Sequence, residues 1–343
     1  MDQLGRYRLV RPDAAMALRG LRMLVGGIAG AEGQVGGGAG RVGGSSELDA
    51  KVEGFLNYAR STGLDVRRQV LALETVPTPT GTRERIAGMC LWVPAPGRTA
   101  MLFGPAQGEF PETAGGTEAA IMAALEDARA AGIVLVQAMM EPADAGGKTV
   151  FASAGLTQLA TLTYMERRPP VQPPPFALPP DFTLVPYEPE NHALFRAAII
   201  GSYAQTLDCP ALSGMRDVED VIEGHKSVGG PGTFDPQLWG VLMKRSPEES
   251  AGSSNGMPVG CLLLGVIPAR RALELVYLGL APEARRQGLG RLLMQRVLAI
   301  ASRRQLDLAT LAVDAANGPA VKLYRRYGYT SVAQRVAMIK KLM

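Results

Sequence analysis

The sequence predicts two mixed α/β domains in tandem, joined by a proline-rich connector. The chain has 343 residues, and compact domains usually hold roughly 100–200. Pro169–Pro180 carries seven prolines in twelve residues, which neither a helix nor a central strand tolerates. The stretches on either side of this segment also resemble each other. We therefore expect domains at residues 1–168 and 181–343, with the connector at 169–180.

The likeness between the two halves appears when the chain is shifted by 173 residues. Ala131–Arg168 then lies over Arg304–Lys341 without a gap, with six of 38 positions identical. Chance would give roughly two at ordinary residue frequencies. The starts match too, since Arg8–Pro12 resembles Thr183–Tyr187 at a shift of 175. Because each half also ends with the same order of helix, strand, turn, short helix and strand, we infer a duplicated domain.

The second half gives the clearer pattern of elements. It is expected to open with a strand at Phe182–Tyr187, followed by helices at about His192–Thr206 and Val218–Lys226. Apolar side chains spaced along one face predict a further helix over Gly288–Arg304. The order fits a mixed sheet covered by helices and not a regular alternation of strand and helix. The other predicted elements are strands at Leu238–Lys244, Val259–Ile267, Ala272–Leu280, Leu306–Val313 and Tyr329–Ile339 and a short helix at Gly318–Arg326.

Composition excludes several classes of protein. The 36 basic and 32 acidic residues leave a net charge of +4, too small for a protein that coats nucleic acid. The three cysteines (Cys90, Cys209, Cys261) are scattered, and there are only two histidines (His192, His225). We therefore expect no disulfide framework, no metal site and no nucleic-acid partner.

Membrane segments are not expected either. The apolar stretch Ala14–Gly30 is interrupted by Arg19 and Arg22, and no uncharged apolar run reaches the length of about 18 residues that a spanning helix needs. A soluble cytoplasmic protein without a membrane partner is the expectation. The oligomeric state stays open.

The segment most informative about chemistry is Leu273–Met294. A strand ends near Leu280, Pro282 stops it, and the residues RRQGLG then lead directly into a helix. Gly288 and Gly290 lack a Cβ where the backbone must approach a neighbour closely or take a positive φ. The first amides of a helix have no intrahelical partner and attract anions. Three arginines, Arg285, Arg286 and Arg291, add positive charge, so a diphosphate or a similar anion is predicted here.

Two common anion-binding motifs do not fit this turn. A dinucleotide fingerprint needs a third glycine at position 293, which is Leu293, and an ATP-binding P-loop needs Gly-Lys-Ser/Thr. The turn instead resembles the acetyl-CoA motif Arg/Gln-x-x-Gly-x-Gly/Ala of the GCN5-related N-acetyltransferase (GNAT) family. Arg285, Gly288 and Gly290 satisfy it, and Pro282 matches the usual exit of the preceding strand.

The resemblance covers about Asp181–Met343 and implies a binding mode for acetyl-CoA as acyl donor. The backbone around Leu278 and Leu280 would pair with the pantetheine arm, and the amides of Gln287–Arg291 would hold the pyrophosphate. Asn317 would cap a short helix and bond to the donor; it could also be a cap alone. The residues implied to bind acetyl-CoA are Leu278, Leu280, Arg285, Arg286, Gln287, Gly288, Leu289, Gly290, Arg291 and Asn317.

Two residues are implied to act on protons. The segment from Asn317 to Tyr329 resembles the family's second motif, and it places Tyr324 beside the sulfur of the donor, where a phenol could protonate the departing thiolate. The alternative is an aromatic residue that only packs. Glu274, eleven residues before Arg285, resembles the general base of one branch of the family; the alternative is a solvated residue at the start of a strand. The implied mechanism is direct attack of an amine, without a covalent intermediate on the enzyme.

His192, His225 and Cys209 fall in the region that forms the acceptor side in this family. A solvated or capping role is the simpler reading of the two histidines. Nothing in these residues identifies the acceptor, which could be a small amine, a lysine or a protein N-terminus.

The first half has lost the features that carry the motif. Glu112 stands where the turn has Arg285, and Glu109 and Glu118 add more negative charge nearby. We therefore expect a degenerate copy that keeps the fold without a site for acetyl-CoA. The other correspondences are Gly115 with Gly288, Thr117 with Gly290, Asp144 with Asn317 and Phe151 with Tyr324.

The function predicted is transfer of an acetyl group from acetyl-CoA to a primary amine in the second half, which would make the protein an N-acetyltransferase. The alternative is a non-catalytic protein of the same fold that binds acyl-CoA or has a regulatory role.

Overall fold

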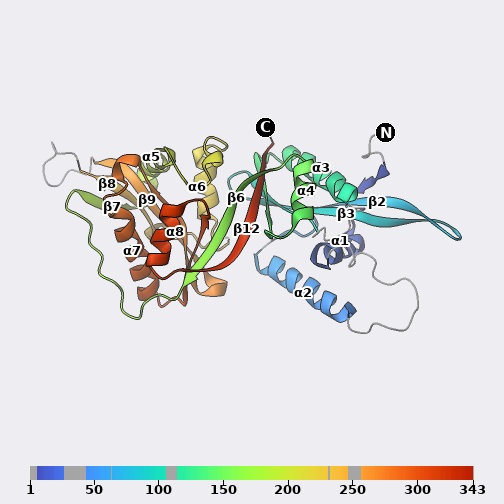
Figure 1. Ribbon diagram of the computed structural model, residues 1–343, viewed down its shortest axis with the longest axis horizontal. Coiled ribbons are helices and arrows are strands. Elements are labelled where there is room, and N and C mark those ends of the chain that lie inside the picture. The colour runs from blue at the N-terminus through green and yellow to red at the C-terminus, as the bar shows by residue number, and fades with distance from the viewer. Residues whose placement is uncertain are drawn as a thin grey trace. The chain divides into compact units, whose positions relative to one another are not determined.

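The computed structural model describes residues 6–26, 44–62, 64–105, 114–230, 232–245 and 256–342. The chain folds into two compact units. One unit consists of Met1–Leu159 with Arg335–Met343, and the other consists of Ala160–Gln334. Figure 1 shows their helices and strands.

The first unit is a mixed sheet with the strand order β1-β2-β3-β4-β5-β12. β2 and β3 form a long antiparallel hairpin, visible in Figure 1, and β4 runs parallel to β5. The strands are β1 (Arg8–Val10), β2 (Gln69–Thr78), β3 (Gly81–Ala95), β4 (Thr99–Phe103), β5 (Leu135–Met140) and β12 (Thr330–Lys341). The helices are α1 (Ala14–Gly26), α2 (Gly44–Thr62), α3 (Ala114–Ala130) and α4 (Ala145–Ser153).

The second unit repeats this arrangement with the order β6-β11-β10-β9-β8-β7. Here β10 is the strand that runs parallel to its neighbour β11. The strands are β6 (Thr157–Arg167), β7 (Phe182–Pro186), β8 (Trp239–Lys244), β9 (Met257–Ile267), β10 (Ala272–Leu280) and β11 (Leu308–Asp314). The helices are α5 (His192–Tyr203), α6 (Val218–Lys226), α7 (Leu289–Arg303) and α8 (Gly318–Arg326).

The last strand of each half belongs to the sheet of the other unit. β12 pairs antiparallel with β5, from Val336 opposite Met140 to Lys341 opposite Leu135. β6 pairs in the same way with β11. The sequence ranges 1–168 and 181–343, which we keep as the proposed units of the duplication, therefore differ from the compact units in their final strands. A boundary drawn from repeat similarity follows the chain and cannot detect such an exchange.

The two halves nevertheless have matching elements in the same order. At the shift of 173 residues, α8 coincides with α4 at both ends and β11 begins where β5 begins. Gly155 and Gly328, also matched, both have positive φ values, of 86° and 78°. The prediction of two tandem mixed α/β folds is confirmed.

The predicted elements of the second half agree closely with the structure. Val218–Lys226, Ala272–Leu280 and Gly318–Arg326 have the predicted bounds, and the others shift by three residues or fewer at either end. Their ends are marked by residues with clear local roles, such as the Asp217 side chain, which accepts a hydrogen bond from Glu219 N and caps α6. The helix predicted over Gly288–Arg304 is α7, whose buried face joins the core around Trp239 and Phe195.

The proline-rich connector contains no helix or strand, as predicted, and it packs on the second unit. The guanidinium carbon of Arg296 lies 5.3 Å from the centre of the Phe176 ring, and Ser302 Oγ donates to the Val171 carbonyl at 3.3 Å. Leu178 contacts the apolar cluster beneath α7. The segment is therefore part of the surface of the second unit.

Two features of the described residues concern membrane spans and metal sites. No helix there combines the length and apolar character needed to cross a membrane. No group of three or more His, Cys, Asp or Glu side chains there has an arrangement that could hold a metal ion.

Candidate active site

The site begins where β10 and β11 separate. Their parallel pairing runs from Ala272 opposite Leu308 to Leu275 opposite Leu311. An irregularity in β10 follows between Leu275 and Tyr277, after which the strand continues to pair with β9 through Leu280. Past Leu275, the edge of β10 that faced β11 is available to an extended ligand, which can add to a sheet edge through main-chain hydrogen bonds.

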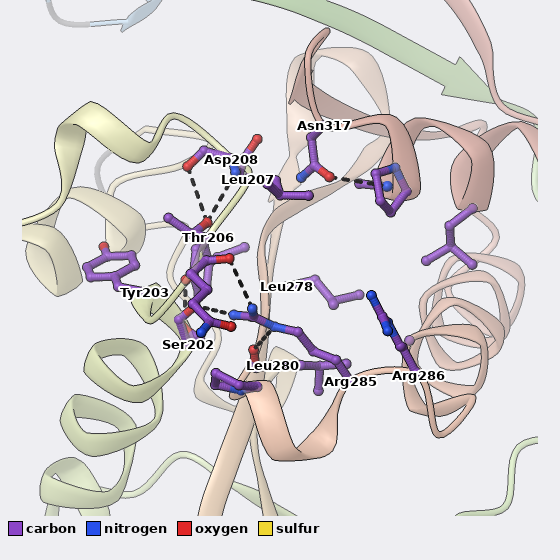
Figure 2. Close-up of a pocket in the computed structure, with 18 of the residues that line it drawn as sticks. Ser202, Tyr203, Thr206, Leu207, Asp208, Leu278, Leu280, Arg285, Arg286 and Asn317 are labelled. Atoms are coloured by element: carbon purple, nitrogen blue, oxygen red, sulfur yellow. Dashed lines mark hydrogen bonds between the residues drawn. The ribbon is translucent and has the colours of Figure 1, made fainter.

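A cavity of about 860 Å³ lies at this opening. One wall is formed by the end of α5 and the loop after it, and the opposite wall by the turn before α7 and the start of α8 (Figure 2). Leu278 and Leu280 of β10 line it, as do Arg286, Gly290 and Asn317. The structure thus brings residues predicted from both motifs to one cavity.

The turn before α7 has the geometry of an anion site. Arg286 and Gly288 have positive φ values of 61° and 80°, and the amides of Arg291 and Leu292 bond back to the Gly288 carbonyl. Amides earlier in the helix have no intrahelical acceptor and carry the positive end of the helix dipole. Donors for a phosphate are therefore concentrated at this end of the cavity.

Gly290 has a different reason from Gly288 to be glycine. An added Cβ would meet only Leu323 Cδ2 at 3.5 Å and Leu280 Cδ1 at 4.0 Å, which are ordinary contact distances. The described packing and backbone thus leave room for a side chain at position 290. The close approach of a ligand to the helix backbone would account for the absence of one.

Arg285 does not present its guanidinium to this anion site as the sequence suggested. Its Nε donates to the Leu280 carbonyl at 2.9 Å, and its two terminal nitrogens donate to the carbonyls of Ser202, Ala204 and Gln205 at 2.7–3.0 Å. Figure 2 shows this side chain directed at the end of α5. Four of its five N–H groups are used within the protein, so Arg285 joins the two walls of the cavity.

The neighbouring predicted residues divide into exposed charges and main-chain donors. Arg286 and Arg291 are exposed and line the cavity. The Gln287 side chain donates to the Glu283 carbonyl at 2.5 Å, and the Leu289 side chain is buried in the core. Gln287 and Leu289 can therefore serve a ligand in the cavity only through their backbone.

Asn317 caps α8 and lines the cavity. Its Oδ1 accepts a hydrogen bond from the amide of Ala320 at 3.3 Å, which confirms the capping prediction. Asp208, on the loop after α5, lines the same end of the cavity (Figure 2). The binding of a donor by Asn317 stays a prediction.

Tyr324 lies one residue beyond the cavity-lining Leu323 and is 8% exposed. Its ring packs against Tyr329 at 6.2 Å between centroids, as the packing alternative proposed. Its hydroxyl has no hydrogen-bond partner among the described residues. Burial, assisted by the negative charge of Asp208, raises the pKa of Tyr324, so the phenol stays protonated at neutral pH.

Glu274 lies further from the cavity, on β10 opposite Gly265 of β9. The missing Cβ of Gly265 would point at Val228, just after α6, so Glu274 occupies the face of the sheet that carries α6. Burial raises the pKa of the Glu274 carboxyl, and the nearby Arg270 opposes this rise. The residue does not line the cavity.

Sequence reasoning missed a polar group on the acceptor side. Ser202, Tyr203, Tyr277 and Asp208 all line the cavity. The hydroxyl groups of Tyr277 and Ser202 are 2.7 Å apart, and the rings of Tyr203 and Tyr277 meet edge to face at 6.2 Å. Burial raises the pKa of both tyrosines. Tyr277 was detectable as one of two polar-tipped residues, with Glu274, in the otherwise apolar strand that leads into the motif.

The two histidines and Cys209 lie outside the lining of the cavity. His192 is held between the Tyr187 hydroxyl at 3.1 Å and Glu219 Oε2 at 2.8 Å, which is a structural role. The His225 ring stacks on Tyr277 at 5.5 Å, and burial lowers its pKa to about 4. Burial raises the pKa of Cys209 to about 12, so its thiol is not a nucleophile.

The corresponding turn of the first unit is closely packed. A Cβ on Gly115 would meet Tyr7 Oη at 3.0 Å, and one on Gly116 would meet the Ala87 carbonyl oxygen at 2.5 Å. Thr117, the counterpart of Gly290, is fully buried. The described part of this turn thus leaves less room for an added Cβ than the turn at Gly290 does. The predicted Glu109 and Glu112 lie outside the described residues.

A sheet that opens between two parallel strands, beside a glycine turn that begins a helix, defines an α/β unit able to bind an extended anionic ligand. Residues 232–329 match the model of the Acetyltransferase (GNAT) family. The second unit therefore contains a GNAT acetyltransferase domain, and the resemblance inferred from the two motifs is confirmed.

A curated relative points to the same class of protein. The chain is 33% identical over 184 residues to a protein of Streptomyces bingchenggensis (strain BCW-1) named mycothiol acetyltransferase. That match covers 52% of this chain and 53% of the relative, so the chain spans about half the length of the curated protein it matches.

Solved structures extend the likeness of fold to both halves. A GCN5-related N-acetyltransferase from Sphaerobacter thermophilus is similar over 98% of this chain and 96% of its own, with a TM-score of 0.57 and 20% identity. A second similar structure is that of a fungal multi-domain β-N-acetylglucosaminidase that contains a GCN5-related glucosamine N-acetyltransferase region. The match covers 97% of this chain and 38% of the fungal chain, with a TM-score of 0.52 and 12% identity. At these identities the likeness shows the fold.

Proposed function

We propose that the second unit transfers an acetyl group from acetyl-CoA to a primary amine. The observation that carries this proposal is the convergence on one cavity of the separated edge of β10, the turn before α7 and the cap of α8. An acyl donor with a peptide-like arm and a diphosphate needs a strand edge and an anion site side by side.

The residues that would hold acetyl-CoA act mainly through their backbone. The main chain around Leu278 and Leu280 would pair with the pantetheine arm, and the amides of 287–291 would bind the pyrophosphate. Arg286 and Arg291, which line the cavity, add positive charge to the same end. Gly290 allows the close approach, and Asn317 adds a polar contact where α8 begins.

The two residues predicted to transfer protons, Tyr324 and Glu274, have suitable electrostatics. Tyr324 is a buried phenol with an unpartnered hydroxyl, suited to return a proton to the departing thiolate. Glu274 has a raised pKa and shares the α6 face of the sheet with Tyr277, which reaches the cavity. We propose Tyr324 as the acid and Glu274 as a candidate base that acts through water.

The acceptor would enter from the wall formed by α5 and its following loop, where Tyr203, Tyr277 and Ser202 place hydroxyl groups. This wall is polar and aromatic, which suits a small molecule or a peptide amine. Mycothiol-type acceptors belong among the candidates because one relative carries that name.

The test is release of free thiol from acetyl-CoA across a panel of amines, amino acids and peptides. The proposal expects at least one amine to give catalytic release together with an N-acetylated product. Binding of acetyl-CoA in calorimetry without release for any acceptor would instead favour the alternative, a non-catalytic acyl-CoA-binding protein.

A further inference from the structure

Asp208 is the one carboxylate among the described residues that line the cavity. It lies on the loop after α5, at the end of the cavity that Asn317 also borders, whereas Arg285 and Arg286 lie toward the other end (Figure 2). The residue keeps exposed surface because it borders the open cavity. A ligand in the cavity would therefore meet positive charge at one end and this carboxylate at the other.

Reciprocal hydrogen bonds fix the position of Asp208. Its Oδ1 accepts from the amide of Asp314, at the end of β11, at 3.1 Å. Asp314 Oδ2 in turn accepts from the amide of Cys209 at 3.2 Å. Thr206 Oγ1 accepts from the Asp208 amide at 3.1 Å and holds the same loop. The carboxylate is thus held rigidly where the two strands have separated.

No cation pairs with these two carboxylates among the described residues. Asp314 is 5% exposed, whereas Asp208 is exposed on the side of the cavity, so a buried carboxylate and a solvent-facing one lie side by side. A positive group in the cavity would lower the electrostatic free energy of this pair. Partial burial, together with the charge of Asp314, raises the pKa of Asp208, and the hydrogen bond from the Asp314 amide opposes this rise. A carboxylate with a raised pKa accepts protons more readily than an ordinary one.

The other groups that face Asp208 are neutral. Asn317 of α8 lines the same end of the cavity. Burial raises the pKa values of Tyr277 of β10, Tyr324 of α8 and Cys209 of its own loop, and the negative charge of Asp208 adds to each rise. Tyr324 is 8% exposed, and its hydroxyl has no hydrogen-bond partner among the described residues. An ammonium group would satisfy the carboxylate and the hydroxyl at once.

We propose that Asp208, in place of Glu274, binds the ammonium group of the acceptor and takes its proton; this assignment rests on the proposed acetyl transfer. The acceptor class is then an amine that is protonated at neutral pH. Asp208 Oδ receives one proton, and the neutral nitrogen forms a bond to the acetyl carbon. The carbon–sulfur bond breaks, Tyr324 protonates the thiolate, and the second proton of the nitrogen returns to Tyr324. Asp208 then releases its proton to solvent.

The test compares the wild type with Asp208→Asn, which keeps an oxygen to accept from the Asp314 amide. With an alkylamine identified in the thiol-release screen, the variant is expected to lose roughly 10²-fold or more in kcat/KM at pH 7. With the O-alkylhydroxylamine analogue, which is already neutral at pH 7, the loss should be less than tenfold. A variant that merely misfolds would lose both activities equally.

Binding provides a readout independent of turnover. Asp208→Asn should bind acetyl-CoA with wild-type affinity in calorimetry, and its complex with CoA should bind the alkylamine at least tenfold more weakly. Asp314→Asn removes the charge that raises the Asp208 pKa, so the acidic limb of its pH–kcat/KM profile should move to lower pH.

Three outcomes would overturn the assignment. The first is an Asp208→Asn variant within threefold of the wild type for both acceptors. The second is loss of the acidic limb in Glu274→Gln with its retention in Asp208→Asn, which would make Glu274 the base. Failure of the wild type to acetylate any amine would remove the proposed function itself, and this assignment with it.

Discussion

Asp144 and Asn317 cap the last helices of the two halves in the same way. The Asp144 carboxylate accepts from the amide of Gly147 at 2.8 Å, and the Asn317 amide oxygen accepts from that of Ala320 at 3.3 Å. The duplication has thus preserved the local fold while changing the charge at the cap. In the second half the capping side chain is neutral and lines a cavity, whereas in the first half it is a carboxylate that would repel a diphosphate.

Gly290→Ala should weaken the binding of acetyl-CoA at least tenfold without destabilising the protein. Its Cβ finds only ordinary contacts, so the free energy of unfolding should stay the same or rise by up to about 1 kcal/mol. Calorimetry with acetyl-CoA and urea denaturation check the two parts.

Two glycines provide controls for that substitution. Gly54→Ala, on the exposed part of α2, should leave binding unchanged because nothing lies within 4 Å of its Cβ. Gly288→Ala should cost about 1–2 kcal/mol of stability because its φ is 80°. If Gly290→Ala bound acetyl-CoA as well as Gly54→Ala does, the close approach at position 290 would be wrong.

Arg285→Lys should destabilise the second unit by about 2–3 kcal/mol. A lysine cannot reproduce a planar fork that reaches carbonyls of both α5 and β10, so several charge-assisted hydrogen bonds are lost. Urea unfolding measures the loss. Arg285 joins the end of α5, where the amine is proposed to enter, to strand β10. KM for the amine should therefore rise more than KM for acetyl-CoA. The opposite pattern would mean that Arg285 contacts the diphosphate instead.

Tyr324→Phe should lower kcat roughly 10²-fold while acetyl-CoA affinity stays at the wild-type value. Stability should change by less than about 0.5 kcal/mol, because the hydroxyl has no partner to lose among the described residues. Steady-state thiol release and calorimetry test this. Unchanged turnover would leave Tyr324 as a packing residue.

His225 should make stability depend on pH. Burial lowers its pKa from 6.5 to about 4, so below pH 6.5 the unfolded chain takes up a proton that the folded chain refuses. The folded state should therefore lose about 2 kcal/mol between pH 7 and pH 5. His225→Phe keeps the ring stacked on Tyr277 and should lose less over the same range. Equal pH dependence of wild type and variant in urea unfolding would contradict this.

The sequence predicted those parts of the site that depend on local patterns. The turn at Gly288 and the cap at Asn317 are set by residues near in sequence, and both were found. The hydrogen bonds of Arg285 to the carbonyls at the end of α5 were not predicted, because these partners lie about 80 residues away in the chain. No local pattern records such a contact.

The polar residues on the wall formed by α5 and the loop after it were missed for the same reason. Asp208 belongs to a loop, Tyr277 to a strand and Ser202 to a helix, and only the folded unit brings them to one cavity. The exchange of β6 and β12 between units could not be predicted from the sequence either, since it leaves the repeat unchanged.

The most direct test of the account is a calorimetric titration of the full chain with acetyl-CoA. One equivalent should bind per chain, and Gly290→Ala should weaken that single event, because the described cavity beside a helix turn belongs to the second unit. Two equivalents per chain, or a single event untouched by Gly290→Ala, would contradict the account.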